Sequence, residues 1–313
     1  MTDEAAFIAA LRGITRHPGA RGLLDDAAVI PPPIGRELVV THDLIAEGVH
    51  YLPADPPGDV AWKLLAVNLS DLAAKGARPI GAVLGYTLAG DSGWDEAFVA
   101  GLGRALDHFN VPLLGGDTIA VPNGSARTLG LTALGEAQAP VPDRRGAHVG
   151  DDLWICGTIG DAGLGLRIAR GEIEGPRRLL KAYRLPMPKL KEGRALAPLV
   201  TAMSDVSDGL LIDAQRMAEA SGLGVTVDLD AVPLSEEARN FGTERADRLR
   251  AATAGDDYAL LFAAPPEARP AIVALKIKAV PIGRLRAKKG LHVVDALGRV
   301  PLPSKLGYEH AGN

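Results

Sequence analysis

The stretch DVAWKLLAVNLSDLAAKGARPIGAVL, from Asp59 to Leu84, is the part of the sequence around which the rest is organised. At helical spacing its apolar residues cover most of the cylinder over 59–76, which predicts a buried helix. A narrow polar line crosses this helix through Asn68, Asp71 and Lys75. Because a buried unpaired charge is costly, the line must face a metal ion, another cation or a water-filled cleft. The alternative is an Asp71–Lys75 pair on a solvated face, which would add little stability.

The composition is that of an ordinary globular protein with room for two domains. The chain has 313 residues, of which 47% are hydrophobic and 23% charged. Its formal net charge of −4 and the lack of a basic patch argue against a nucleic-acid partner. The single cysteine, Cys156, excludes an internal disulfide and a cysteine-based zinc site, and its apolar neighbours predict a buried side chain.

The N-terminus carries no recognisable targeting signal. The segment MTDEAAFIAALRGI is acidic and amphipathic, without a basic region or a long apolar core. No later apolar run approaches the length of a membrane span. We therefore expect a cytoplasmic protein that has no membrane partner.

Strand and helix patterns alternate in both halves of the chain, which predicts two α/β domains over 1–145 and 146–313. The first is expected to contain a helix at 3–14, a turn-rich segment at 17–33 with a short strand, a strand from Glu37 that ends in a polar loop holding His42, Asp43, Glu47 and His50, a helix at 59–76, a strand at 79–88, a helix at 93–109, a strand at 111–114 that runs into a GGDT turn at 115–118, and a strand at 126–137.

The second domain is expected to begin with a buried strand around Cys156 and a glycine-rich loop. It continues with a mobile, basic crossing segment at 170–194, a strand and helix at 203–222 in which Ser207 caps the helix, a strand at 224–229, a polar helix at 236–251, the Asp256–Asp257 pair before a strand, and two strands at 279–285 and 290–295.

Carboxylates recur at the ends of these predicted elements, at Asp25, Asp26, Asp43, Asp71, Asp117, Asp205, Asp208, Asp256 and Asp257. The chain has no cationic cluster large enough to neutralise them, and like charges packed together cannot all stay ionised. Magnesium binds carboxylate and phosphate oxygens, so the pattern suggests a nucleotide site with several magnesium ions. Glycines in GGDT would let backbone N–H groups approach phosphate closely.

Each of these features also has a simpler explanation. Asp205, Ser207 and Asp208 are typical of an ordinary helix N-terminus, and an Asp-Asp pair before a strand is often only a turn. His42 and His50 could bind zinc, but no second pair supports this, so a surface or substrate contact is favoured. The GDAGLG segment at 160–165 is a poor dinucleotide loop, and no GxxxxGK[ST] sequence is present. ATP would therefore bind outside the P-loop fold.

Taken together, eight blocks resemble the thiamine-monophosphate kinase family, in that family's order and over nearly the whole chain. They are LDDAAV at 24–29, HDLIAEGVHY at 42–51, WKLLAVNLSDLAAKGARP at 62–79, GGDT at 115–118, RRGAHVGD at 144–151, SDVSDGL at 204–210, GDDYALLF at 255–262 and GYEH at 307–310. The resemblance implies the two-domain fold of the aminoimidazole ribonucleotide synthetase superfamily, an α+β arrangement with an N-terminal mixed sheet that pairs across a homodimer and a C-terminal α/β domain.

The resemblance also implies a reaction, in which the γ-phosphoryl group of ATP passes to thiamine monophosphate in a magnesium-dependent, in-line transfer. By motif, the magnesium set is Asp26, Thr41, His42, Asp43, Asp71, Asp117, Asp205 and Asp208. ATP contacts are Gly116, Asp117, Arg144 and Ser207, the substrate contacts are His50, Asp256 and Tyr308, and the catalytic residues are Asp71, Asp117, Arg144 and Asp208. The acceptor phosphate is already ionised, so no general base is required, and Arg144 can stabilise the transferring group.

The chain departs from the family pattern at four positions. Leu24 stands where glycine is usual, His42 where threonine is usual and Lys75 where methionine is common. Asp256 replaces the usual glutamate and reaches one methylene less far. Two alternatives stay open: another ATP-dependent synthetase of the superfamily, acting on an aminoimidazole precursor, and a nucleotide-binding partner without turnover.

Overall fold

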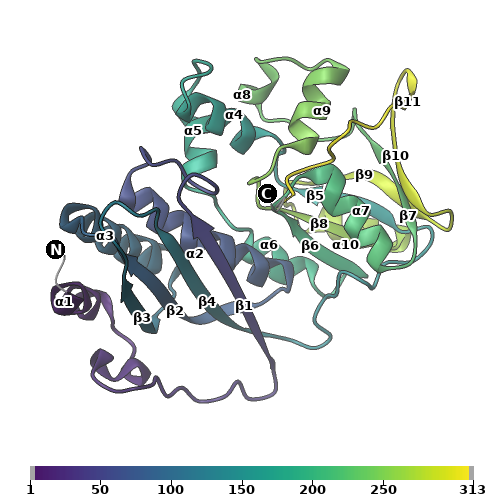
Figure 1. Ribbon diagram of the computed structural model, residues 1–313. Coiled ribbons are helices and arrows are strands. Elements are labelled where there is room, and N and C mark those ends of the chain that lie inside the picture. The colour runs from purple at the N-terminus through teal and green to yellow at the C-terminus, as the bar shows by residue number, and fades with distance from the viewer. Residues whose placement is uncertain (1–3, 310–313) are drawn as a thin grey trace. The chain divides into compact units, whose positions relative to one another are not determined.

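The computed structural model of the protein describes residues 4–309 (Figure 1). Contacts divide the chain into two compact units, Met1–Leu72 with Ala77–Ala139 and Ala73–Gly76 with Pro140–Asn313. Each unit holds its own β-sheet, and both sheets mix parallel with antiparallel pairs, which confirms the expected two-domain fold. Residue 3 of the predicted first helix and His310 of the GYEH block lie outside the described residues.

The first unit has a four-stranded sheet in the order β1-β4-β2-β3, in which only the β2–β3 pair is parallel. Figure 1 shows α2 and α3 together on one face of this sheet. The elements are α1 (Glu4–Ile14), η1 (Pro18–Leu23), β1 (Glu37–Ala46), α2 (Pro57–Ala74), β2 (Arg78–Leu88), α3 (Ser92–Phe109), β3 (Leu113–Ala120) and β4 (Thr128–Ala137).

Helix α2 is the predicted buried helix. Leu64, Leu65, Leu69 and Leu72 are fully buried, as the helical spacing of the apolar residues predicted. Its last residues, Ala73 and Ala74, belong to the second unit. Although α2 and α3 each have 18 residues, no helix within the described chain is long and apolar enough to cross a membrane.

Three expectations for the first unit were wrong. Residues 17–33 contain a 3-10 helix and no strand, because the prolines at 31–33 lack the N–H groups that a sheet ladder needs. His42 and Asp43 lie inside β1 and not in the loop that follows it. GGDT is not a turn, since Gly115–Thr118 pairs in parallel with β2. A Cβ atom at Gly116 would lie 2.5 Å from the Leu84 carbonyl oxygen, so glycine permits this close pairing.

The second unit has a seven-stranded sheet in the order β11-β10-β7-β9-β5-β8-β6. Its elements are β5 (Asp152–Cys156), α4 (Asp161–Ala169), α5 (Arg177–Arg184), α6 (Leu190–Leu196), β6 (Ala202–Val206), α7 (Leu210–Ala220), β7 (Gly224–Asp228), α8 (Glu236–Arg239), α9 (Arg245–Thr253), β8 (Ala259–Ala264), η2 (Pro266–Ala268), α10 (Arg269–Ala274), β9 (Ala279–Arg286), β10 (Gly290–Asp295) and β11 (Gly298–Val300).

Both faces of the central strands are buried. On β5, Leu153 and Ile155 join a core that includes the apolar stripe of α7, whereas Trp154 and Cys156 join a second core with Phe262. Such continuous apolar runs are expected of strands that are covered on both sides. The buried position predicted for Cys156 is therefore confirmed.

The segment 170–194 contains most of two helices, α5 and α6, because Leu179 and Tyr183 give α5 a buried side despite its basic composition. Its mobility stays a prediction. One expectation for the second unit was wrong. The polar stretch 236–251 is divided into α8 and α9 at Gly242, whose φ of 139° a side chain rarely adopts.

Candidate active site

The polar line of α2 meets the inner face of β1. Thr41 and Asp43 alternate onto the face that covers α2, and the Thr41 hydroxyl donates a hydrogen bond to the Asp71 carboxylate. The Asp43 backbone N–H donates to Asn68 Oδ1 at 3.1 Å, while Asn68 Nδ2 donates to the Leu64 carbonyl at 3.0 Å. The line therefore faces polar groups of β1, as its burial requires.

Lys75 belongs to the second unit. Its Nζ donates to the carbonyl oxygens of Pro142 and Met203, each at 3.3 Å. The lysine that replaces the family's usual methionine thus binds two backbone carbonyls, one just before the RRGAHVGD block and one directly before the SDVSDGL block.

Asp117 lies on the other face of the sheet. The register aligns Asp43 with Leu131, Leu84 and Gly116 across the four strands, so these residues share the inner face. Asp117 is one residue further along β3 and points to the outer face. Because β1 and β3 are the two edges of the sheet, three interstrand spacings of about 4.8 Å separate their backbones. Asp43 and Asp117 therefore lie on opposite faces and at opposite edges of this sheet.

The outer face also carries His42. Its Nδ1 is 2.9 Å from Thr132 Oγ1 on β4, and its neighbours along β1, Val40 and Leu44, are exposed. Asp26 lies on an exposed bend beside Asp25, where its backbone N–H donates to the Asp25 carboxylate. His42 and Asp117 therefore lie on the outer face, opposite the face on which Thr41 meets Asp71.

The loop that carries His50 is tied to α2. Lys63, a residue that is 2% exposed, donates from its ammonium group to the His50 carbonyl at 2.9 Å. His50 Nδ1 accepts a hydrogen bond from the Ala46 N–H at 3.1 Å, and this bond requires the ring proton, when the ring is neutral, to sit on Nε2. The family resemblance pointed to His50. It did not point to Lys63, which binds the His50 backbone.

In the second unit, the β6–α7 junction collects carboxylates. Asp205 is buried at the end of β6, and Ser207 and Asp208 precede the helix. Gly209 occupies the N-cap position with φ of 132° and no side-chain cap bond, so the predicted capping by Ser207 was wrong. Asp213, which lies inside the helix, binds the backbone at the helix start instead. Its carboxylate accepts hydrogen bonds from the N–H groups of Asp208 and Gly209 at 3.2 and 3.3 Å.

Asp213 and Arg216 surround Asp208 with charge. The Arg216 guanidinium forms an ion pair with Asp208 and another with Asp213 at 3.2 Å. Burial, followed by the Asp208 carboxylate, raises the pKa of Asp213, and the positive charges of Arg216 and Arg144 oppose this rise. Arg144 therefore lies within electrostatic reach of this junction. The sequence motifs did not point to Asp213 or Arg216.

Backbone hydrogen bonds bring two of the three predicted acceptor contacts, Asp256 and Tyr308, to the same junction. The N–H of Asp256 donates to the Ser207 carbonyl at 2.8 Å, and the N–H of Tyr308 donates to the Asp208 carbonyl at 2.8 Å. Tyr258 donates its hydroxyl to Asp256 Oδ1 at 3.0 Å. Three segments far apart in the sequence thus meet around Ser207 and Asp208.

Asp257 fixes this loop from behind. Its carboxylate accepts from the N–H groups of Gly160 and Ala162, at 2.7 and 3.3 Å, at the start of α4. Burial raises its pKa well above the ordinary range, and the two N–H groups oppose the rise. The Asp-Asp pair is thus neither a simple turn nor two equivalent ligands, because the Asp257 carboxylate binds the start of α4 whereas the Asp256 backbone binds Ser207.

The carboxylate and hydroxyl oxygens of the predicted magnesium residues are of the kind that binds magnesium, but they come together only in small groups. No three His, Cys, Asp or Glu residues between positions 4 and 309 converge into a metal site. Carboxylates and hydroxyls are the hard ligands that Mg²⁺ prefers, and magnesium is usually held by one or two carboxylates together with phosphate oxygens. The Thr41–Asp71 pair and the Asp205–Asp208 segment therefore fit ions that arrive with a nucleotide better than a cage made of protein alone.

Comparisons with known proteins identify the chain. The N-terminal domain model of AIR synthase related proteins matches residues 24–137, and the C-terminal domain model matches residues 148–296. Thiamine-monophosphate kinase of Caulobacter vibrioides is 40% identical and covers 96% of this chain and 88% of its own.

Solved structures agree with this similarity. Thiamine-monophosphate kinase from Stenotrophomonas maltophilia K279a aligns with a TM-score of 0.81 and 36% identity over 91% of this chain and 94% of its own. AaThiL complexed with AMPPCP and TMP aligns with a TM-score of 0.78 and 27% identity over 91% of each chain. The chain therefore belongs to the thiamine-monophosphate kinase family.

Proposed function

We propose that this protein is an ATP-dependent kinase that converts thiamine monophosphate and ATP to thiamine diphosphate and ADP. The observation that supports this most strongly is the 40% identity to a thiamine-monophosphate kinase over 96% of the chain. AaThiL, complexed with AMPPCP and TMP, supports the same pair of substrates. A cytoplasmic location remains a prediction from the sequence.

The proposed chemistry is direct in-line transfer. An oxygen of the acceptor phosphate attacks the γ-phosphorus of ATP, the bond from that phosphorus to the β,γ-bridging oxygen breaks, and ADP leaves. The attacking oxygen is ionised at neutral pH, so the protein needs to supply positioning and positive charge and not a base. We assign Arg144 to the transferring group, Gly116, Asp117 and Ser207 to ATP, and His50, Asp256 and Tyr308 to the acceptor.

Magnesium ions would be held by Asp26, Thr41, His42, Asp43, Asp71, Asp117, Asp205 and Asp208, with His42 contributing its backbone carbonyl. Bound Mg²⁺ neutralises phosphate charge and orients the groups that exchange the phosphoryl. Other residues of the chain orient these proposed ligands. Asn68 fixes the backbone at Asp43, and the Thr41 hydroxyl orients the Asp71 carboxylate. Asp213 organises the backbone at Asp208.

We further propose a homodimer in which the β1 edge of one copy joins the β3 edge of the other. The outer sheet face exposes Leu38, Val40, Leu44, Val83 and Ile119. Several large apolar side chains exposed on one sheet face support an interface there. Closing two four-stranded sheets into one barrel would bury it and leave no open edge. It would also bring strand β1, which carries Asp43, beside strand β3 of the other copy, which carries Asp117.

Substrate competition tests the reaction. Purified protein with Mg-ATP is given either thiamine monophosphate or the linear precursor of aminoimidazole ribonucleotide, and ADP release is followed. ADP formed only with thiamine monophosphate supports the kinase. ADP formed only with the other substrate would move the chain to a different activity of the superfamily, and tight Mg-ATP binding with no stimulation by either would support a partner without turnover.

Mixed dimers test the shared site. Asp43→Asn and Asp117→Asn chains are coexpressed with different tags and purified through both tags, so every dimer holds one of each. If each site takes one aspartate from each copy, one of the two sites is intact and about half of the wild-type activity returns. Mixed dimers as inactive as either variant alone would show that the two aspartates do not come from different copies.

A further inference from the structure

Lys75 departs from the family pattern, and the proposed reaction gives it no role. It follows α2 and belongs to the second unit. The Gly76 N–H donates to the Ala73 carbonyl at 3.0 Å, and Gly76 has a φ of 60°, which favours glycine. A Cβ atom at Gly76 would lie 2.5 Å from the Ala197 Cβ, so the helix end packs closely on the end of α6. The Lys75 side chain therefore starts from a fixed backbone.

The Lys75 ammonium group joins the edge of a sheet to the segment beside it. Strand β6 is the last strand of the seven-stranded sheet. An edge strand has backbone groups that need partners outside the sheet. The Met203 N–H donates to the Asp143 carbonyl at 3.3 Å, and Lys75 Nζ donates to the Met203 carbonyl at 3.3 Å. Because Lys75 Nζ also donates to the Pro142 carbonyl at 3.3 Å, one side chain holds this segment against β6.

Arg144 comes directly after this segment. Its carbonyl accepts from Ser221 Oγ at 3.3 Å, and the Arg145 N–H donates to the Asp143 carboxylate at 2.9 Å. Hydrogen bonds from Arg145 lower the pKa of Asp143 to about 2, and the charge of Lys75 adds to this shift. Within the described part of the chain, the Arg144 guanidinium has no hydrogen-bond or ion-pair partner. The backbone on both sides of Arg144 is thus held, while its guanidinium stays available for a phosphate group.

We propose that Lys75 is a positioning residue for phosphoryl transfer, which holds the backbone before Arg144 against β6. This inference rests on the proposed function, in which Arg144 contacts the transferring group and Asp205 binds magnesium. Met203 lies two residues before Asp205, so the two carbonyls that Lys75 binds lead to both of these groups. The family's usual methionine has no N–H group and can make neither bond. A displacement of about 1 Å at a reacting group can cost on the order of a hundred-fold in rate.

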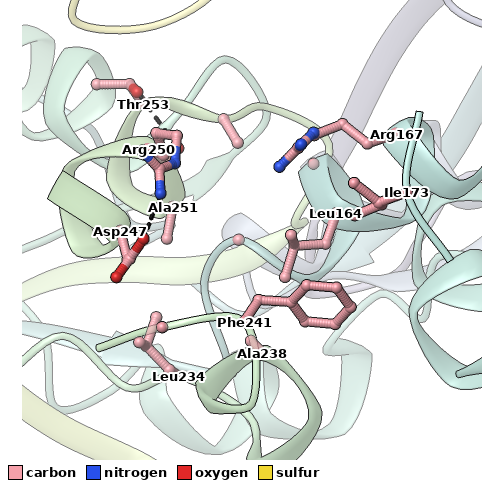
Figure 2. A pocket seen from close by; sticks show the side chains of 14 residues that line it. Leu164, Arg167, Ile173, Leu234, Ala238, Phe241, Asp247, Arg250, Ala251 and Thr253 are labelled. Atoms are coloured by element: carbon pink, nitrogen blue, oxygen red, sulfur yellow. Dashed lines mark hydrogen bonds and ion pairs between the residues drawn. The ribbon is translucent and has the colours of Figure 1, made fainter. Parts of the chain in front are cut away.

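The proposed role of Lys75 is separate from the cavity of about 510 Å³ in the same unit (Figure 2). Phe241 is part of the wall of this cavity, and residues 253–254 line it shortly before Asp256. The cavity therefore adjoins a proposed acceptor contact. Lys75 and Arg144 do not line it, so a substitution of Lys75 leaves its wall in place.

Steady-state kinetics of Lys75→Met test this role. Because Arg144 is assigned to the transferring group, its displacement should lower kcat by roughly ten-fold or more, while the KM values for ATP and thiamine monophosphate each stay within about three-fold of wild type. Lys75→Arg keeps cationic N–H donors and should retain kcat to within about three-fold. Lys289→Met is the matched control, because it removes an exposed lysine of the same unit, and its kcat should not change.

A double-mutant cycle separates positioning of Arg144 from a merely structural role. Arg144→Ala removes the group that Lys75 is proposed to position, so adding Lys75→Met should then lower kcat by less than about two-fold. Lys75→Gln, which keeps N–H donors on a shorter side chain, gives the same comparison if Lys75→Met does not fold.

Three results would count against the inference and leave the proposed kinase standing. They are a wild-type kcat in Lys75→Met, an undiminished loss of kcat in the Arg144→Ala background, and a loss of kcat in Lys75→Arg as large as in Lys75→Met. Absence of thiamine diphosphate from the wild-type reaction would instead refute the kinase, and the inference with it.

Discussion

Replacing Asn68 with alanine should destabilise the first unit by about 1–3 kcal/mol. Asn68 is fully buried and joins α2 to β1, because its Oδ1 accepts the Asp43 N–H at 3.1 Å. The Leu64 carbonyl loses the Asn68 side chain but keeps its helical bond, so little of the cost arises there. Most of it comes from the Asp43 N–H, which loses this acceptor beside a packed helix.

The assay is urea unfolding followed by tryptophan fluorescence in a Trp154→Phe background. The two remaining tryptophans, Trp62 and Trp94, both lie in the first unit, so the signal reports that unit. Asn123→Ala, in an exposed loop of the same unit, is the control and should change the free energy of unfolding by less than about 0.5 kcal/mol. An Asn68→Ala change as small as that of the control would refute the role given to this hydrogen bond.

Three further predictions concern the second unit. Burial, helped by Glu192, raises the pKa of Cys156 to about 11, so iodoacetamide at pH 8 should modify the native chain far more slowly than the urea-unfolded chain, and equal rates would contradict its burial. Because the pKa of Asp257 is raised in the folded state, the stability it contributes is complete below its unfolded pKa of about 3.9 and falls as pH rises toward the folded pKa. Asp257→Asn should flatten this fall in unfolding experiments above pH 4, and an unchanged slope would count against the raised pKa. Asp256→Glu, which restores the family's usual residue, should keep or lower the KM for thiamine monophosphate, and a ten-fold rise, about 1.4 kcal/mol, would remove Asp256 as an acceptor contact.

The sequence predicted best those elements whose own periodicity determines them. Helix α2 and the buried stripe of α7 followed from apolar residues at helical spacing. The polar line through Asn68 and Asp71 meets polar groups of β1, and the metal ion, cation or cleft expected against it stays a prediction. The two-domain fold followed from alternation of strand and helix patterns together with the family blocks.

Features that depend on partners distant in the sequence could not be predicted in this way. GGDT resembles a turn by composition, but its pairing with β2 makes it an edge strand. Ser207 is a residue type that often caps helices, but Gly209 occupies the N-cap position of α7. The Asp213 carboxylate accepts the backbone hydrogen bond from Asp208 instead. The separation of Asp43 from Asp117 follows only from strand order and register, and the cavity beside Phe241 is lined by segments from 160 to 254.

The most direct test of the central proposal compares how much thiamine diphosphate and ADP the wild type and the Asp71→Asn variant form. Purified protein is incubated with Mg-ATP and thiamine monophosphate, and thiamine diphosphate and ADP are measured together. We expect equal amounts of the two products from wild type, and a loss of at least a hundred-fold, about 2.7 kcal/mol, in the variant, with unfolding unchanged because an asparagine can still accept the Thr41 hydrogen bond. Full activity in Asp71→Asn, or ADP without thiamine diphosphate, would contradict the account.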